Sequence, residues 1–438
     1  MSLEVSSFYA SGQGLPFAGR WATMPVRQAR PLDVGEVDAQ WRARLTRPIT
    51  GNTRLAYVHI PFCATQCQFC GFYINREHDA AVARYADMLM EELALESASV
   101  LHQSTPLKAI FIGGGTPTVL TAGQLHRLIS GLKQALPLTE DCEITVEGRI
   151  LNFDDERIDA CLEAGANRFS IGIQTFDTRL RRRLGRRADR DQAVAFIRGL
   201  AERDRAAVIC DLMFGLPGQT LGIWREDLRI IADLPLDGVD LYALNLLPGT
   251  PLEKAASRGR TDIPSVAQAR ERYLQGATWL AEHDWRQLSN SHWARTSRER
   301  NLYNLNIKRG ADYLAFGSGA GGNLAGQSFM VHRSLEKYYP MLAQGRKPLM
   351  MMTDVNEHYR WQMQLQGFIE TGHGDLAELV ADPSPLYPLL SQWRGRGLLS
   401  HEEGYFQLTD EGRFWASNLL HALRTLVGQL RQSRPGSL

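Results

Sequence analysis

The chain has 438 residues, of which 44% are apolar and 22% charged, and its formal net charge is +1 at pH 7. These values are ordinary for a globular protein of one large domain with appendages, or of two domains. The balanced charge gives no general attraction to nucleic acid, and no apolar run is long enough to predict a membrane span. Six cysteines, three of them in one loop, do not suggest a secreted disulfide framework. We therefore expect a cytoplasmic protein.

Residues 1–50 contain no clear element, and we expect them to form an extension packed on the domain that follows. From residue 51, strand-like and helix-like segments alternate, which predicts an α/β fold with a parallel sheet wrapped by helices. The expected strands lie at 55–60, 107–112, 142–146, 168–173, 206–214 and 239–246. The expected helices lie at 156–163, 190–203, 222–232 and 264–285, and a capping box of Thr121 and Gln124 predicts another.

The alternation ends near residue 331, so we predict a core of residues 51–330 and a helix-rich domain of residues 331–438. In this tail, a short hairpin pattern and the string Leu408-Thr409-Asp410-Glu411-Gly412 resemble a winged-helix fold. Such folds often bind DNA, but the tail has no dense basic helix. We therefore expect a packing or substrate-lid role and no nucleic-acid partner.

Cys63, Cys67 and Cys70 lie in one loop directly after the first expected strand. Three clustered thiolates are suited to one [4Fe–4S] cluster, and because such clusters usually have four cysteine ligands, one iron would stay open to a substrate. A structural zinc site is the alternative, with His59 as its nearest fourth ligand. His59 precedes Cys63 within the expected strand, so we expect its side chain to point elsewhere.

Glycine-rich and polar motifs follow the later strands. The string at 113–116, Gly-Gly-Gly-Thr, stands between a strand and a helix. Glycine there lets the backbone approach a ligand, although a tight turn without a ligand would need the same residues. Glu147 ends a strand, where its carboxylate could bond a ribose hydroxyl or an ammonium group, or form a salt bridge with Arg149.

The three-cysteine loop after a first strand is the signature of the radical S-adenosylmethionine (SAM) superfamily. Further motifs resemble, in the same order, its oxygen-independent coproporphyrinogen oxidase and haem-chaperone group: Gly113–Thr118, Ile173–Phe176, Leu184–Arg186 and Asp211–Gly218. The resemblance implies a partial (β/α)6 barrel, with a [4Fe–4S] cluster on Cys63, Cys67 and Cys70 and SAM on the open iron. It also implies that nine residues bind SAM: Tyr57, Phe69, Gly114, Gly115, Thr116, Glu147, Gln174, Arg186 and Asp211. Of these, Gln174, Arg186 and Asp211 would bind a second SAM.

Two positions after the cluster loop discriminate within this group. Phe72 stands where these coproporphyrinogen oxidases carry another cysteine, and Gly71 stands where the haem chaperones have an acidic residue. The continuation Gly71-Phe72-Tyr73 and the string Val146-Glu147-Gly148-Arg149 are most similar to a third branch, the anaerobic haem-utilisation enzymes (ChuW/HutW), which are radical SAM methyltransferases.

That branch implies a defined reaction. One SAM is cleaved reductively, a second donates a methyl group to the haem macrocycle, and the ring opens to a linear tetrapyrrole with release of iron without oxygen. A reductant such as flavodoxin is the implied partner, and we assign no side chain as catalytic. The alternatives are a chaperone that transfers haem without turnover and an oxidase that decarboxylates coproporphyrinogen III.

Two further features suggest how a porphyrin could be held. Seven arginines between residues 179 and 190 could bind propionates through paired guanidinium hydrogen bonds, or could form a solvated helix face. We expect a ligand role for Arg186 and at most one other. His292 and His332 could ligate haem iron, but a lone histidine is more often a satisfied polar group.

Overall fold

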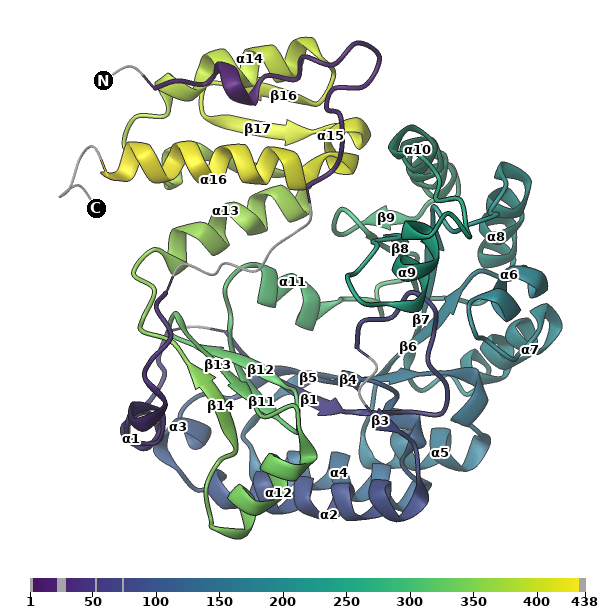
Figure 1. The fold of residues 1–438 in the computed structure, drawn as a ribbon, viewed down its shortest axis with the longest axis vertical. Coiled ribbons are helices and arrows are strands. Elements are labelled where there is room, and N and C mark those ends of the chain that lie inside the picture. The colour runs from purple at the N-terminus through teal and green to yellow at the C-terminus, as the bar shows by residue number, and fades with distance from the viewer. Residues whose placement is uncertain (1–2, 22–28, 52, 73–74, 433–438) are drawn as a thin grey trace.

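The computed structural model describes residues 3–21, 29–51, 53–72 and 75–432. Within these residues, a twelve-stranded sheet forms the centre of the molecule and helices cover it (Figure 1). Its central strands are parallel and neighbour one another in chain order: β1 (Arg54–Ile60), β4 (Leu107–Gly114), β5 (Leu138–Gly148), β6 (Arg168–Gln174), β7 (Ala207–Phe214) and β8 (Gly238–Ala243). They form the partial six-unit barrel that the resemblance implied.

Short strands extend both edges of the parallel core. On one side β11 (Asp312–Phe316) pairs parallel with β1, followed by antiparallel β12 (Gly321–Leu324), β13 (Gln327–Val331) and β14 (Leu349–Met352). On the other side β10 (His292–Ala294) and β9 (Arg286–Gln287) pair antiparallel beyond β8. Within the described residues the two edges are not joined by strand pairing, so the barrel is open along one seam.

Helices follow the parallel strands, as the sequence predicts. They include α2 (Asp79–Glu96), α4 (Ala122–Ala135), α5 (Asp155–Ala164), α6 (Thr178–Arg183), α7 (Arg190–Ala201), α8 (Leu221–Asp233), α9 (Pro251–Ser257) and α10 (Val266–Glu282). The predicted capping box is present, because the Thr121 side chain accepts from the Gln124 backbone N–H and the Gln124 side chain accepts from Thr121. β8 ends before the predicted residue 246, since the chain turns toward α9 with a hydrogen bond from Thr250 N to Leu247 O.

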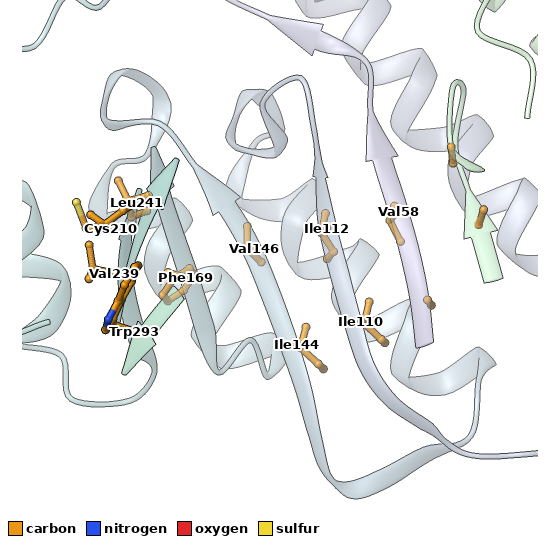
Figure 2. Close-up of a cluster of buried hydrophobic side chains, with 14 of the residues drawn as sticks. Val58, Ile110, Ile112, Ile144, Val146, Phe169, Cys210, Val239, Leu241 and Trp293 are labelled. Carbon is orange, nitrogen blue, oxygen red and sulfur yellow. The ribbon is translucent and has the colours of Figure 1, made fainter. Parts of the chain in front are cut away.

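Alternation along the parallel strands separates an apolar face from a polar face. In β5, Ile144 and Val146 join the main hydrophobic core, as does Phe169 in β6 (Figure 2). The intervening residues of β5, Thr145 and Glu147, are polar and point to the opposite side. The polar face of these strands therefore lines the inside of the barrel, where the candidate site lies.

The C-terminal unit contains a three-stranded sheet and four helices. In chain order it comprises α13 (Tyr359–Thr371), β15 (His373–Asp375), α14 (Tyr387–Gly395), β16 (Leu399–Glu402), β17 (Tyr405–Leu408), α15 (Asp410–Phe414) and α16 (Ala416–Gln432). The hairpin of β16 and β17 followed by α15 agrees with the winged-helix-like fold predicted from sequence. Figure 1 shows α11 (Leu302–Lys308) between this unit and the barrel sheet. Across the described chain, no helix combines the length and apolar character that crossing a membrane requires.

The first part of the N-terminal extension lies on the C-terminal unit (Figure 1). Trp393 of α14 donates its indole N–H to Phe8 O at 3.1 Å, and the ring of Phe17 lies 5.5 Å from that of Trp415. The expectation that the extension packs on the barrel is therefore wrong for residues 3–21. Its apolar side chains are instead buried against those of α14 and α16.

The second part of the extension forms α1 (Val34–Leu45), a helix that the sequence analysis did not predict. Trp41 of α1 packs on Phe329 of β13 with ring centroids 4.9 Å apart. The sequence signals for this helix were present, because its buried residues Val37 and Trp41 are four positions apart and Asp33 donates its N–H to Glu36 Oε2 at 3.3 Å in a capping box. Contact with the sheet edge then fixes where the helix lies.

A buried ion pair joins the barrel to its antiparallel edge. Lys347 lies 2.7 Å from Glu92 of α2, and both side chains are almost completely buried. Glu92 also accepts from Tyr338 of α12 (Leu335–Ala343) and from the backbone N–H of Gly317, which follows β11. Both oxygens of this carboxylate therefore make contacts, and they link α2 to the segments of Lys347, Tyr338 and Gly317.

We predict that Lys347→Met lowers the free energy of unfolding by about 3–5 kcal/mol, because it leaves the Glu92 carboxylate buried without its counter-charge. Urea unfolding followed by circular dichroism measures the change. The exposed Lys337 of α12 provides the control, and Lys337→Met should alter stability by less than about 0.5 kcal/mol. Equal stability of the two variants would show that the buried pair contributes nothing.

Candidate functional site

Cys63, Cys67 and Cys70 line one cavity at the C-terminal end of the parallel strands. Cys63 ends the short strand β2 (Phe62–Cys63), which pairs with β3 (Asn75–Arg76). The loop after it is held by a turn from Cys70 N to Cys67 O at 3.2 Å and by Gln68 N, which donates to Leu184 O. The predicted metal ligands are therefore brought together by a loop that neighbouring segments fix at both ends.

The surroundings of these thiols fit an iron–sulfur cluster. All three cysteines are free of disulfide bonds. Thr116 Oγ1 lies 3.4 Å from Cys63 Sγ, and the backbone N–H of Phe72 donates to Cys70 Sγ at 3.3 Å. Burial raises the pKa of Cys63, while Thr116 and the positive charge of Arg149 oppose that increase. Hydrogen bonds to sulfur and nearby cations stabilise thiolates, the form that binds iron.

The glycine string is required by packing within the protein as well as by any ligand. A Cβ on Gly113 would lie 2.5 Å from Glu147 Oε2, and one on Gly115 would lie 2.5 Å from the carbonyl oxygen of Phe62. Gly114 has a φ of +111° and donates its N–H to Glu147 Oε2 at 3.1 Å. Gly114, Gly115 and Thr116 all line the cavity with the cysteines, and their role in binding SAM stays a prediction.

Gln174 and Arg186 also line the cavity. Gln174 is buried with a φ of +71°, a conformation that is uncommon for a residue with a side chain and that often occurs at functional sites. Arg186 donates to Gly172 O at 2.5 Å, but its buried Nε has no hydrogen-bond partner among the described residues. Burial lowers the pKa of Arg186, and the Cys67 thiol acts in the opposite direction. An anionic group in the cavity would satisfy this cation.

Two carboxyl groups complete the cavity wall. Burial raises the pKa of Glu147 to about 7, and the negative charge of Asp211 adds to this effect. Burial likewise raises the pKa of Asp211 to about 7, and the negative charge of Asp240 adds to it. Ser170 donates to Asp211 Oδ1 at 3.1 Å. Asp211 lies inside β7 rather than at its end, so the side chain enters the cavity from the barrel wall. Both carboxyl groups could bond to hydroxyl or ammonium groups of a cofactor.

The two predicted aromatic positions lie in different places. Phe69 lines the cavity and packs with the cluster of Leu184, Met213 and Leu216. Tyr57 does not line this cavity and instead packs with the aromatic rings of Phe111 and Tyr303. Phe69 is thus placed to contact a ligand beside the cysteines, and the stacking role of Tyr57 stays a prediction.

His59 points away from the cysteine cavity, as expected from its position in β1. Its Nδ1 lies 2.9 Å from the Tyr57 hydroxyl, and its ring lies against Gly114. Burial lowers the pKa of His59 to about 4, and the charge of Arg333 adds to this effect. His59 therefore does not complete a zinc site with Cys63, Cys67 and Cys70.

A column of buried charges inside the barrel escaped the sequence analysis. Arg168 of β6 lies 3.0 Å from Glu299, and Glu299 lies 2.9 Å from His292 Nε2. The other ring nitrogen of His292 lies 3.0 Å from Asp240 Oδ2. Asp240 is the register partner of Asp211, so the column reaches the cavity wall. Arg168 alternates with Ser170 and Gln174 along β6, which was the available signal for that strand, whereas Glu299 lies outside the strands and has no such pattern.

This column excludes His292 as a haem ligand, because both of its ring nitrogens face carboxylates. Burial opposes its positive charge, but Asp240 and Glu299 outweigh burial and raise the pKa of His292 to about 9. His292 is therefore protonated at neutral pH. His332 lies after β13, and burial lowers its pKa.

The arginine-rich segment divides between the inside and the outside of the barrel. Arg181 is buried and donates to the carbonyl oxygens of Ile173 and Thr175, so it holds the end of β6. Arg186 alone among the seven lines the cysteine cavity. A separate hollow of about 800 Å³ beside α8 is lined by Arg179, Arg182, Arg183 and Arg190. Arg186 thus lies where its expected ligand role requires, and that role stays a prediction.

Large apolar side chains are exposed beside the cysteine cavity. Phe72 is 61% exposed, Leu246 is 40% exposed and Leu247 is 38% exposed. Leu247 lies next to the cluster loop, since a Cβ on Gly71 would come within 3.0 Å of its Cδ1. The mouth of the barrel therefore offers apolar contacts near the three thiols, as a large planar ligand requires.

Comparison with known proteins supports this description of the site. Residues 57–231 match the family model of the radical SAM superfamily. Anaerobilin synthase from Escherichia coli O157:H7 is 51% identical over 427 residues, which cover 97% of this chain and 96% of that protein. Heme chaperone HemW from Bacillus subtilis (strain 168) is 28% identical over 84% of this chain and 98% of that protein.

A solved structure supports the fold independently. Coproporphyrinogen III oxidase (HemN) from Escherichia coli, described as a radical SAM enzyme, superposes with a TM-score of 0.75. The match covers 88% of this chain and 93% of that chain at 22% identity. At this identity the likeness establishes the shared fold.

The charge column predicts a pH-dependent stability. The pKa of His292 is raised from 6.5 to about 9, so its contribution to stability is fully present below about pH 6.5 and is lost as the pH rises through 9. The free energy of unfolding should therefore fall between about pH 7 and pH 9.5. His292→Gln should be less stable at neutral pH and should show a smaller fall. Urea unfolding at several pH values, with both proteins in the same state of cluster loading, measures the two pH dependences. The same pH dependence in His292→Gln and the unmodified protein would contradict the role given to His292.

Proposed function

Because the chain belongs to the radical SAM superfamily and, within it, to the family of anaerobilin synthase, we propose that it methylates haem and opens the macrocycle. The product is a linear tetrapyrrole, and iron is released without oxygen. The observation that carries the proposal is the cavity that combines three cysteines, an unsatisfied buried arginine and two carboxyl groups next to exposed apolar side chains. We place the reaction in the cytoplasm, where reducing conditions preserve thiolate ligands.

The residues of the cavity have distinct roles in this proposal. Cys63, Cys67 and Cys70 hold the [4Fe–4S] cluster, which supplies, when bound, the electron for reductive cleavage of SAM. Glu147 and the glycine string hold the amino-acid end of the first SAM through a carboxylate and backbone N–H groups. No side chain acts as a nucleophile, and the protein binds, orients and excludes water.

A second SAM is the finer part of the proposal. Gln174, Arg186 and Asp211 lie together on the far wall of the same cavity, on β6, after α6 and on β7. Arg186 offers a guanidinium to a carboxylate, and Asp211 offers an acceptor to ribose hydroxyls or an ammonium group. A methyl donor held there would face the first SAM across the cavity, which is the proximity that the transfer needs.

The two alternatives have less support. The identity to anaerobilin synthase is 51%, against 28% to heme chaperone HemW, although HemW also covers most of this chain. Phe72 replaces the extra cysteine of the coproporphyrinogen oxidases, and its side chain is largely exposed. A reductant such as flavodoxin is the remaining partner in the proposal.

The direct test is an anaerobic assay with haem, SAM and a reductant, followed by absorbance and mass spectrometry. With haem, we expect loss of the haem absorbance spectrum and formation of a linear tetrapyrrole that carries one added methyl group and no iron. With coproporphyrinogen III, we expect no decarboxylation. Haem transferred intact without SAM consumption would instead identify a chaperone. Vinyl formation from coproporphyrinogen at the rate of SAM consumption would identify an oxidase.

Cluster ligation has its own prediction. Reconstituted protein should hold about four irons and four sulfides per chain. Cys70→Ala should abolish cluster and turnover together, because Cys70 is one of only three protein ligands in the proposal. Cys142→Ala is the matched control, since Cys142 is a buried thiol of β5 outside the cavity, and it should retain both. Stoichiometric zinc in the native protein, or a full cluster in Cys70→Ala, would refute the assignment.

The second SAM is tested by Asp211→Asn. The substitution removes a negative charge with little change of shape, so methyl transfer should fall about ten-fold or more beyond any loss of reductive SAM cleavage. Deoxyadenosine and methylated product, quantified in the same reaction, give the two rates. Asp159→Asn, on the exposed face of α5, should change neither. Equal loss of both products would argue against a separate site.

A further inference from the structure

A second cavity, of about 310 Å³, lies between the barrel and the C-terminal unit. It is lined by the end of β8, by α10 and α13, by the start of α16 and by the N-terminal extension. Tyr242 of β8 is 41% exposed there, and its hydroxyl is hydrogen-bonded to Asp240. Asp240 is the register partner of Asp211, which lines the cysteine cavity, and Tyr242 is two residues further along β8, so the side chains that border the two cavities here project from the same face of the sheet.

Two guanidinium groups line this second cavity without an ion pair among the described residues. Arg20 lies over the ring of Phe414 at 4.7 Å, and within the described residues it has no hydrogen bond and no ion pair. Arg413 donates to Asn290 Oδ1 at 3.3 Å and to Thr371 O at 2.9 Å, and no described carboxylate lies within ion-pair distance of it. Burial lowers the pKa of both arginines.

The two guanidiniums converge on one part of the cavity. The Tyr273 hydroxyl donates to Asn290 O at 2.7 Å and Arg413 donates to Asn290 Oδ1, while Arg20 lies over Phe414, whose ring is 5.8 Å from that of Tyr273. The third cation of the cavity, Lys308, is already paired with Glu370 at 2.5 Å. The exposed Arg20 and the half-buried Arg413 therefore remain without an ion pair among the described residues, although Asp410 and Glu370 act on the charge of Arg413 from a greater distance.

We infer that Arg20 and Arg413 form a binding site for the two propionate carboxylates of the tetrapyrrole, an inference that rests on the proposed function. Haem carries two neighbouring propionates on one edge of an apolar macrocycle. Two cations in one cavity with Tyr242, followed along the chain by the exposed Leu246 and Leu247, match that distribution of charge. Guanidinium groups bind carboxylates through paired hydrogen bonds. The opposite edge of the macrocycle then faces the cysteine cavity.

This site also gives the N-terminal extension and the C-terminal unit a role in recognition. Arg20 belongs to the segment that lies on the C-terminal unit, where Asn418 donates to Gly19 O at 2.9 Å and so fixes the adjacent backbone. Arg413 belongs to α15 of that unit and reaches Asn290 of the barrel. Neither residue lies in the segment of the chain that carries the cluster motif. The substrate would thus be clamped by parts that are distant in sequence.

The test compares haem with haem dimethyl ester, which has the same macrocycle without the negative charges. Binding of each to the full-length, cluster-loaded protein is followed by absorbance titration in the absence of SAM. We expect Arg20→Ala to weaken haem binding about ten-fold, the loss of one charge-assisted contact, and to change binding of the ester little. Arg413→Lys keeps the charge and should give a smaller loss that is again confined to haem.

Arg30→Ala is the matched control, because Arg30 is an exposed arginine of the same extension that pairs with Asp354 outside the cavity. It should bind both ligands as the unmodified protein does. Equal weakening of haem and ester by Arg20→Ala, or no weakening of either, would overturn the inference.

Failure of the inference is distinguishable from failure of the proposed function. If the unmodified protein produces the linear tetrapyrrole while Arg20→Ala retains full preference for haem over its ester, the reaction stands and the propionate site is wrong. If Arg20→Ala loses that preference while no variant or parent produces the tetrapyrrole, the carboxylate site stands and the reaction is wrong.

Discussion

The arrangement of this molecule depends on one constraint, the alternation of side chains along parallel strands that are buried on both faces. Residues such as Ile144 and Val146 must pack against helices, so their neighbours Thr145 and Glu147 are forced into the barrel interior. Charges placed there lose their hydration and need partners. The column from Arg168 through Glu299 and His292 to Asp240 supplies partners from strands far apart in sequence.

The same desolvation that makes the column necessary also prepares the cavity. Glu147 and Asp211 are left at the end of the column without a cation of their own, and the pKa of each is raised to about 7. Arg186, on the same wall as Asp211, is left with a nitrogen that has no hydrogen-bond partner among the described residues. A buried guanidinium and two carboxyl groups with raised pKa values therefore lie in one small space. A bound zwitterionic ligand, with an ammonium and a carboxylate group, would satisfy both.

Local signals predicted most of the fold and most of the cavity. Strand-length apolar runs and the Thr121 capping box are encoded by neighbouring residues. The motifs predicted that Gln174, Arg186 and the three cysteines lie in one site. Contacts between distant segments were not readable in this way. Nothing near Phe17 or Trp41 indicates that one packs on the C-terminal unit and the other on a sheet edge. The partners of His292 likewise depend on β8 and β10 lying side by side, which a single sequence does not reveal.

The open seam of the barrel connects the chemistry to the shape of the substrate. A closed barrel would fill its interior with side chains, whereas here the edges at β9 and β14 stay apart and the C-terminal unit lies beside the barrel, with a cavity between the two. A macrocycle is too broad for the cysteine cavity of about 160 Å³ alone. Because the proposal places the cluster and SAM in that cavity, the macrocycle must lie at its mouth and be covered by another part of the chain. The N-terminal extension and the C-terminal unit are placed to do this, and their two free guanidiniums are what an anionic edge would need.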